Sequence, residues 1–248
     1  MTEKAQNNDE IIEKAKDFFR EVIAKNHIKN TEKLKNINNF NVNPFLNKYL
    51  ANYLTGNDDP ESVSKALIYP RVLGTSINTS FGSNLQKFIN KTLEGYGSTT
   101  TGMDIEFIDK IDGRKKYCQI KAGPQTINYD DVTTIQNHFK SAINLARTNN
   151  IPIANMDCVV GVFYGEDSEL SAFYRTLAED YTVLAGKDFW YHLTGDEDFY
   201  QKLTDGIGDI ANEFDSTELL DETIKALAEQ LKNIEGIEAV SYTHLRAH

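Results

Sequence analysis

Four polar side chains with the chemistry of a hydrolytic site occur close together in the segment "TGMDIEFIDKIDGRKKYCQIKAGPQTIN". Its two halves, "MDIEFID" and "KKYCQIKA", alternate polar and apolar residues, which is typical of half-buried strands. The pair Asp112-Gly113 between them is typical of a two-residue hairpin turn. That turn would place Asp104 opposite Lys121 and Glu106 opposite Gln119. All four side chains would then share one face of the hairpin.

This set of side chains suits metal-assisted hydrolysis of a phosphodiester. The Asp104 carboxylate can bind a hard cation such as Mg²⁺, and either the Gln119 side-chain oxygen or the Ile120 backbone carbonyl can add a neutral ligand. Lys121 can orient the attacking water, lower its pKa or stabilise charge on the phosphate. The alternative is an ordinary solvated sheet face, where an opposed Asp–Lys pair contributes only a few tenths of a kcal/mol.

The rest of the sequence predicts one α/β domain that positions this hairpin. Helical periodicity covers residues 9–36, 44–54 and 59–69, and a polar, glycine-containing loop is expected at 70–84. A helix capped by Ser83 and closed by Gly95 precedes the hairpin, and a helix with Asn128 as its N-cap follows it. A buried strand is expected at 156–165, with helices at 186–203 and 221–234. We divide the domain into a helical N-terminal section (1–82), a core with C-terminal helices (83–238) and a non-native tail (239–248).

Bulk composition narrows the class of protein. The chain has 248 residues, 40% of them hydrophobic and 25% charged, as in soluble globular proteins. Its net charge is −11, but residues 1–150 carry 20 Lys and Arg against 17 Asp and Glu, whereas residues 151–248 carry 6 against 20. The half that contains the hairpin is therefore mildly basic and permits DNA binding. The two cysteines lie in apolar runs typical of strands, so we expect free thiols in a reducing compartment. The sequence shows no signal peptide and no membrane-spanning run. We therefore expect a cytoplasmic protein with no membrane partner.

The pattern of Asp104 followed by Gln119-Ile-Lys121 on the next strand resembles the PD-(D/E)XK nuclease superfamily. Residues from about 44 to 200 also resemble one group of type II restriction endonucleases. The stretches that carry this resemblance are "NPFLNKYLANYLTG", "LIYPRVLGTSINTSFG", "CQIKAGPQTIN" and "GKDFWYHLTGDEDFY". The resemblance implies a restriction-endonuclease-like fold, in which helices flank a central mixed sheet. It also implies a homodimer that uses Mg²⁺ to cut double-stranded DNA at a short palindrome, with a cognate DNA methyltransferase in the same system.

The sequence departs from the superfamily at Gln119, where most members have Glu or Asp. Glutamine supplies an oxygen ligand without charge, so metal affinity should fall unless another carboxylate helps. Glu106 is the candidate for that carboxylate, and its alternative role is a solvated strand acid.

Residues on both sides of the hairpin are candidates for DNA contacts. Arg71 could bind a phosphate or form a surface ion pair, and Asn128 could bind a phosphate or simply cap its helix. Phe189 and Trp190 are expected in the core, and His138 and His192 are expected to be structural. The full set of candidate DNA contacts is Arg71, Thr75, Ser76, Asn78, Thr126, Asn128 and Tyr129.

Three hypotheses about function remain open from the sequence. The leading one is a sequence-specific endonuclease of a restriction–modification system. The second is a modification-dependent or structure-specific nuclease, which the neutral Gln119 favours. The third is a non-catalytic DNA-binding protein that has lost metal binding, against which Asp104 and Lys121 count.

Overall fold

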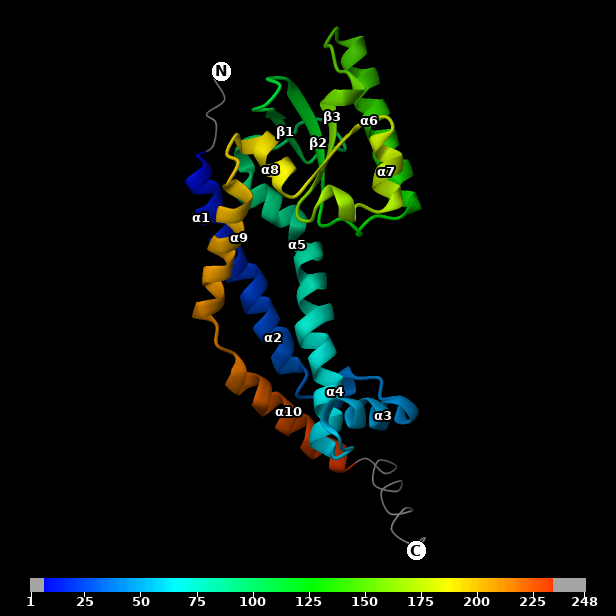
Figure 1. The fold of residues 1–248 in the computed structure, drawn as a ribbon, viewed down its shortest axis with the longest axis vertical. Helices are drawn as coiled ribbons and strands as arrows, with labels where there is room; N and C mark the ends of the chain where they lie inside the picture. Colours follow the sequence, from blue (N-terminus) through cyan, green and yellow to red (C-terminus); the bar gives the residue numbers. More distant parts are fainter. Residues whose placement is uncertain (1–6, 234–248) are drawn as a thin grey trace, which may run out of the picture. The chain divides into compact units, whose positions relative to one another are not determined.

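A computed structural model describes residues 7–233 and divides into two compact units (Figure 1). The sheet unit combines the chain up to Phe19 with Asn84–Ile210. The helical unit combines Arg20–Ser83 with the chain from Ala211 onward. The predicted sections differ from these units, because the first helix belongs with the sheet and the last helix belongs with the helical unit. The predicted tail, 239–248, lies outside the described residues.

The sheet unit is built on a four-stranded mixed sheet in the order β1-β2-β3-β4. β1 pairs with β2 in antiparallel fashion, while the β2–β3 and β3–β4 pairs are parallel. This arrangement confirms the predicted mixed sheet with flanking helices. The strands span Ile105–Ile108 (β1), Lys115–Lys121 (β2), Cys158–Val162 (β3) and Thr182–Ala185 (β4).

Helices cover both faces of this sheet. α6 and α7 lie on one side of the strands and α8 on the other (Figure 1). On the first side, Ile135 and Phe139 of α6 pack in one core cluster with Val160 of β3. On the second, the ring of Phe189 lies directly over Gly161, where no side chain intervenes. The helices of this unit span Asn8–Phe18 (α1), Ile77–Thr92 (α5, whose first turns belong to the helical unit), Tyr129–Thr148 (α6), Ala172–Ala178 (α7), Lys187–Thr194 (α8) and Phe199–Ile210 (α9).

The helical unit has a core of its own. Ala51, Val63 and Leu227 come from three different helices and belong to one buried cluster. The N-caps follow the predicted residue types: Asp59 accepts a hydrogen bond from the Ser62 amide at 2.8 Å. The helices span Lys25–Lys33 (α2), Pro44–Thr55 (α3), Pro60–Pro70 (α4) and Thr217–Lys232 (α10), with a π-helical segment at Phe19–Ala24 before α2.

The predicted loop at 70–84 is wrong, because this segment is helical. A π-helical segment, Arg71–Ser76, leads directly into α5. Proline and glycine suggested a break, but Pro70 ends α4 with helical backbone angles, and a single glycine is tolerated inside a helix. Val72 is 6% exposed, so burial of an apolar side chain stabilises the helix here. Ser83 therefore lies inside α5 and is not its cap, and the helix ends at Thr92, before Gly95.

The predicted hairpin turn is also wrong, and the strand register changes with it. The loop is longer than two residues, because the Asp109 amide donates to the Arg114 carbonyl at 2.9 Å, which leaves four residues between them. Within this loop Gly113 has a positive φ and Asp112 does not, whereas the predicted turn needs a positive φ at both. Glu106 therefore lies opposite Tyr117, and not opposite Gln119. The register moves by two residues, so each side chain keeps its predicted face.

Two elements of the sheet unit were not predicted: the short helix α7 and the edge strand β4. Both cysteines are buried and free, which agrees with their expected place in the core. Among the helices of residues 7–233, none is long and apolar enough to cross a membrane.

Candidate active site

The candidate active site begins at Asp104, which directly precedes β1 and contacts β2. The Asp104 amide donates to the Cys118 carbonyl at 2.9 Å, and the Asp104 carboxylate accepts the Ile120 amide at 2.7 Å. Burial raises the pKa of Asp104, and the Ile120 hydrogen bond and the nearby positive charge of Lys121 offset part of this rise. A cation bound to this carboxylate would favour its ionised form.

Gln119 lies on β2, on the face that α6 covers. Its side chain is buried, and its Nε2 lies 3.1 Å from Nδ1 of His138 on α6. With the amide donating to the ring, its carbonyl oxygen points away from His138. The same ring lies within electrostatic reach of Asp104. His138 therefore joins the candidate site, although the sequence indicated only a structural histidine.

Lys121, the last residue of β2, faces the start of α6. Its Nζ lies 3.7 Å from Oδ1 of Asp131, and both side chains are about one-quarter to one-third exposed. Asp131 and Asn128 form a capping box at the N-terminus of α6. The sequence contained a signal for these contacts of α6 with Lys121 and Gln119. Asp131 and His138 are seven residues apart on a helix that directly follows β2, so they share one helix face.

Glu106 shares the sheet face with Gln119, but its carboxylate is engaged elsewhere. Lys115 Nζ lies 2.8 Å away, and the hydroxyls of Ser98 and Thr100 each donate to it at 2.7 Å. Burial alone would raise the pKa of Glu106, but these three partners outweigh burial and lower the pKa to about 2. Glu106, with its side chain 11% exposed, is thus a paired acid in the edge strand, and not the solvated strand acid that was its alternative role.

Three of the candidate DNA contacts lie in the sheet unit. Thr126 Oγ1 donates to the Gly123 carbonyl at 2.8 Å, in the turn between β2 and α6. Asn128 caps α6, since its side chain accepts the Asp131 amide at 3.0 Å, as the sequence indicated. Tyr129 is 71% exposed at the first residue of the helix. A free phosphate would meet these residues at a helix N-terminus.

The other four candidates lie in the helical unit, on helix and not on the expected loop. The Arg71 guanidinium donates to the Asn39 carbonyl at 2.5 Å and lies 4.8 Å from the centre of the Phe40 ring. This geometry differs from the surface ion pair that was its alternative. Thr75 Oγ1 lies 3.4 Å from the Pro70 carbonyl, Asn78 is exposed and Ser76 is half-buried.

Phe189, Trp190 and His192 occupy the core and structural roles that the sequence indicated for them. Phe189 and Trp190 are fully buried, which confirms their place in the core. His192 Nδ1 lies 2.7 Å from the buried carboxylate of Asp109, next to the hairpin loop. Lys116, also buried, contacts Asp112 at 2.5 Å in the same region. These contacts stabilise the loop that ends the hairpin.

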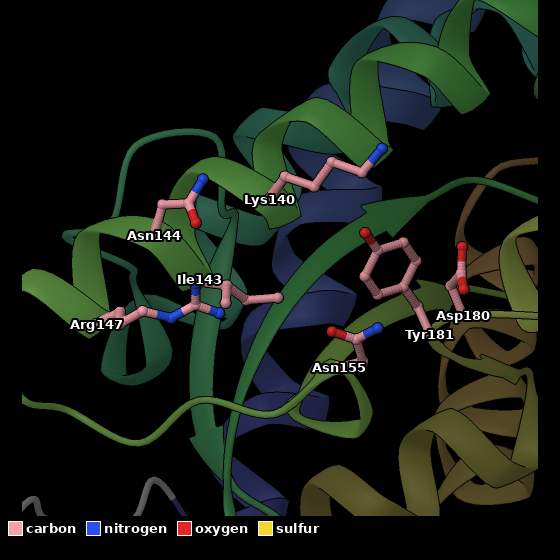
Figure 2. Close-up of a pocket in the computed structure, with 7 residues that line it drawn as sticks. All are labelled: Lys140, Ile143, Asn144, Arg147, Asn155, Asp180 and Tyr181. Atoms are coloured by element: carbon pink, nitrogen blue, oxygen red, sulfur yellow. The ribbon is translucent and has the colours of Figure 1, made fainter.

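A cavity of about 340 Å³ lies elsewhere in the sheet unit (Figure 2). Lys140 and Arg147 of α6 contribute to one wall, and Asp180 and Tyr181 stand on the opposite side. None of the candidate catalytic residues lines this cavity. It is therefore separate from the candidate active site.

The donor set fits a hard divalent cation. Asp104 offers a carboxylate, and Gln119 and the Ile120 carbonyl are neutral oxygen donors on the neighbouring strand. Mg²⁺ keeps several waters and is commonly bound by one or two carboxylates plus substrate phosphates. Among residues 7–233, no three His, Cys, Asp or Glu side chains gather as a complete metal cage. The residues present thus suit a metal that is shared with a phosphate-bearing substrate.

Comparison with known proteins gives one family. The family model of the type II restriction endonuclease EcoO109I matches residues 13–215. The match covers both units and includes the hairpin with Asp104, Gln119 and Lys121. No curated protein gives a significant match to the chain.

Proposed function

Since the chain belongs to the family of the type II restriction endonuclease EcoO109I, we propose that it is a Mg²⁺-dependent enzyme that hydrolyses phosphodiester bonds at a specific sequence of double-stranded DNA. The observation that carries this proposal is the meeting of Asp104, Gln119 and Lys121 at neighbouring ends of β1 and β2. Family membership supports a sequence-specific DNA endonuclease. These three residues support the location of its active site in the protein.

Each residue has a separate role in the proposed reaction. Bound Mg²⁺ would supply Lewis-acid stabilisation of charge on the scissile phosphate. Asp104 would hold it through its carboxylate, and Gln119 and the Ile120 carbonyl would add neutral oxygens. Lys121, on the partly exposed edge, orients the attacking water and stabilises negative charge on the phosphate oxygens. We leave Glu106 out of the metal ligands, because Lys115, Ser98 and Thr100 already engage its carboxylate.

The proposed partners follow from the substrate. A palindromic site calls for a two-fold symmetric protein, so the active form is a homodimer. A cognate methyltransferase protects the same sequence in the host. Thr126, Asn128 and Tyr129 contact DNA near the cut, and Arg71, Thr75, Ser76 and Asn78 contact it from the helical unit.

One observation favours a second candidate, a modification-dependent nuclease. Gln119 adds no charge, and its amide is bonded to His138. A glutamine at this position also occurs in branches of the superfamily that cut modified DNA. The two candidates differ in substrate, since only the first cuts unmethylated DNA.

Incubation of the protein with unmethylated plasmid tests the proposal. With Mg²⁺ we expect discrete bands, and without metal we expect none. Asp104→Ala and Lys121→Ala should each abolish cutting and still shift specific DNA in a gel with Ca²⁺. Asp180→Ala and Lys140→Ala, which remove the same charges at the separate cavity, serve as matched controls. Cutting by either active-site variant at the wild-type rate would refute the site, and cutting of methylated plasmid alone would favour the second candidate.

A further inference from the structure

α3 carries its apolar side chains on the outside. Ala51, on its inner face, is fully buried in the core of the helical unit, and Asn47 beside it is 7% exposed. The Asn47 amide nitrogen is buried without a hydrogen-bond partner within the described residues. The opposite side of the helix, here called the α3 apolar face, consists of Phe45 (88% exposed), Leu46 (53%), Tyr49 (63%), Leu50 (43%), Tyr53 (81%) and Leu54 (49%).

The spacing of these residues makes the exposure systematic. Positions 45, 49 and 53 recur every four residues, as do 46, 50 and 54, so all six lie on one side of the helix. An ordinary surface helix has the reverse arrangement, with its apolar stripe on the core and polar side chains outside. α3 packs with a small and a polar residue instead and leaves the large side chains for another surface.

The size of the face indicates what covers it. Aromatic side chains bury about 150–250 Å² each, so Phe45, Tyr49 and Tyr53 alone expose roughly 350–600 Å² at these fractions. That already equals the largest apolar patch of a typical monomer, about 300–600 Å². The three leucines extend it toward the approximately 800 Å² per partner of a standard protein interface. Tyrosine and phenylalanine are also enriched in such interfaces.

We propose that the α3 apolar face is the surface through which two copies of this chain associate. Two α3 helices can pack antiparallel across a two-fold axis, where each apolar face meets its own copy. Tyr49 and Leu50, at the middle of the stripe, then lie nearest the axis. The choice of a second copy as the occupant rests on the proposed function, because a palindromic site requires a two-fold symmetric protein.

The mass of the protein in solution, measured without DNA or metal, tests the surface separately from the activity. Wild-type protein should sediment as a dimer. Tyr53→Glu should weaken the dimer by about thirty-fold or more, because an exposed aromatic anchor is replaced by a charge that would be buried. Leu145→Glu provides the matched control: Leu145 is 58% exposed on α6, so this substitution should leave the dimer unchanged.

Cross-linking supplies a second readout. Leu50→Cys should form a covalent dimer on oxidation, whereas Leu145→Cys should not, and the two native cysteines are buried. A monomeric wild type, an unchanged dimer in Tyr53→Glu or equal cross-linking of both cysteine variants would overturn the proposal. A dimer that depends on α3 but cuts no DNA would leave this surface standing and remove the proposed function.

Discussion

Gln119 is where the proposed site differs from the usual pattern of the PD-(D/E)XK superfamily, which the sequence resembles. A carboxylate there would add charge next to the metal, and it would accept a hydrogen bond from the His138 ring in place of donating one. Gln119→Glu should therefore keep cleavage and lower the Mg²⁺ concentration for half-maximal activity several-fold. A Mg²⁺ titration of the cleavage rate measures this shift. Loss of all metal-dependent activity would show that a neutral residue at 119 is required.

The ion pair of Glu106 makes a prediction about stability and pH. Its folded-state pKa of about 2 lies below its ordinary value of 4.5, so the ionised form stabilises the fold above pH 4.5. This contribution shrinks as the pH falls from 4.5 toward 2. Lys115 is 48% exposed, so we discount for solvent screening and expect Glu106→Gln to cost about 1–3 kcal/mol at pH 7.

Urea unfolding of the wild type and Glu106→Gln at pH 7 and pH 3 checks this prediction. The difference in the free energy of unfolding should be largest at pH 7 and clearly smaller at pH 3. Equal differences at both values would mean that the carboxylate charge contributes nothing. Full Mg²⁺-dependent cleavage by Glu106→Gln would agree with a structural role, whereas inactive but stable protein would return Glu106 to the metal ligands.

At the residue scale, the sequence predicts which side chains share the candidate site better than it predicts their hydrogen-bond partners. Asp104, Gln119 and Lys121 come together because strand alternation alone places them on one face, and an error of two residues in register leaves that face intact. Glu106 was paired with Gln119 incorrectly because the hairpin loop is longer than the predicted two-residue turn. Its hydrogen-bond partners, Ser98 and Thr100, were missed because they precede the strand in a segment without periodicity. His138 was missed because its contact depends on how α6 packs on the sheet.

Gly161 shows how closely β3 and α8 pack. A Cβ at this position would collide with the ring of Phe189, which is fully buried. Gly161→Ala should therefore destabilise the protein by about 1–3 kcal/mol through overpacking. Gly208→Ala is the matched control, because a Cβ added at that position in α9 would point into open space and its φ is ordinary. It should be neutral or stabilising by up to about 1 kcal/mol.

Thermal unfolding of the two alanine variants distinguishes these effects. A melting temperature for Gly161→Ala equal to that of Gly208→Ala would mean that α8 can shift away from the sheet at no cost.

Among the elements, long periodic helices and the hairpin strands were predictable, and short or interrupted ones were not. α6 has a clear apolar stripe and a capping box, so its start at Tyr129 follows from the sequence. The prediction of a loop at 70–84 failed because proline and glycine are typical of loops, while the burial of Val72, which favours the helix, depends on tertiary packing. The edge strand Thr182–Ala185 is too short for its alternation to be distinctive.

Charge at the scale of the whole molecule predicts how DNA binding responds to salt. Residues 1–150, with 20 Lys and Arg against 17 Asp and Glu, should supply the phosphate contacts. Each neutralised phosphate releases counterions, so the logarithm of affinity should fall linearly with the logarithm of salt concentration. With about six contacts the loss between 50 and 200 mM salt is roughly 10³-fold.

Fluorescence anisotropy with a cognate duplex and Ca²⁺ measures this slope. Arg71→Ala should reduce the slope by about one unit if Arg71 binds a phosphate. Arg175→Ala, from the acidic part of the chain, should leave it unchanged. Binding that does not respond to salt would contradict the proposed DNA contacts.

The chain crosses between the two units three times, after Phe19, Ser83 and Ile210. These crossings restrict how the protein can be divided. The sheet unit is not a continuous stretch of sequence, since α1 must return to pack against α9. A gene fragment encoding residues 84–210 would lack α1 and would expose the apolar side of α9, including Leu203 and Ile210. Recombination that exchanges only residues 84–210 between relatives would pair α1 of one parent with α9 of the other, while the core of the helical unit would keep all its residues from one parent. α1 and the segment 84–210 must therefore vary together.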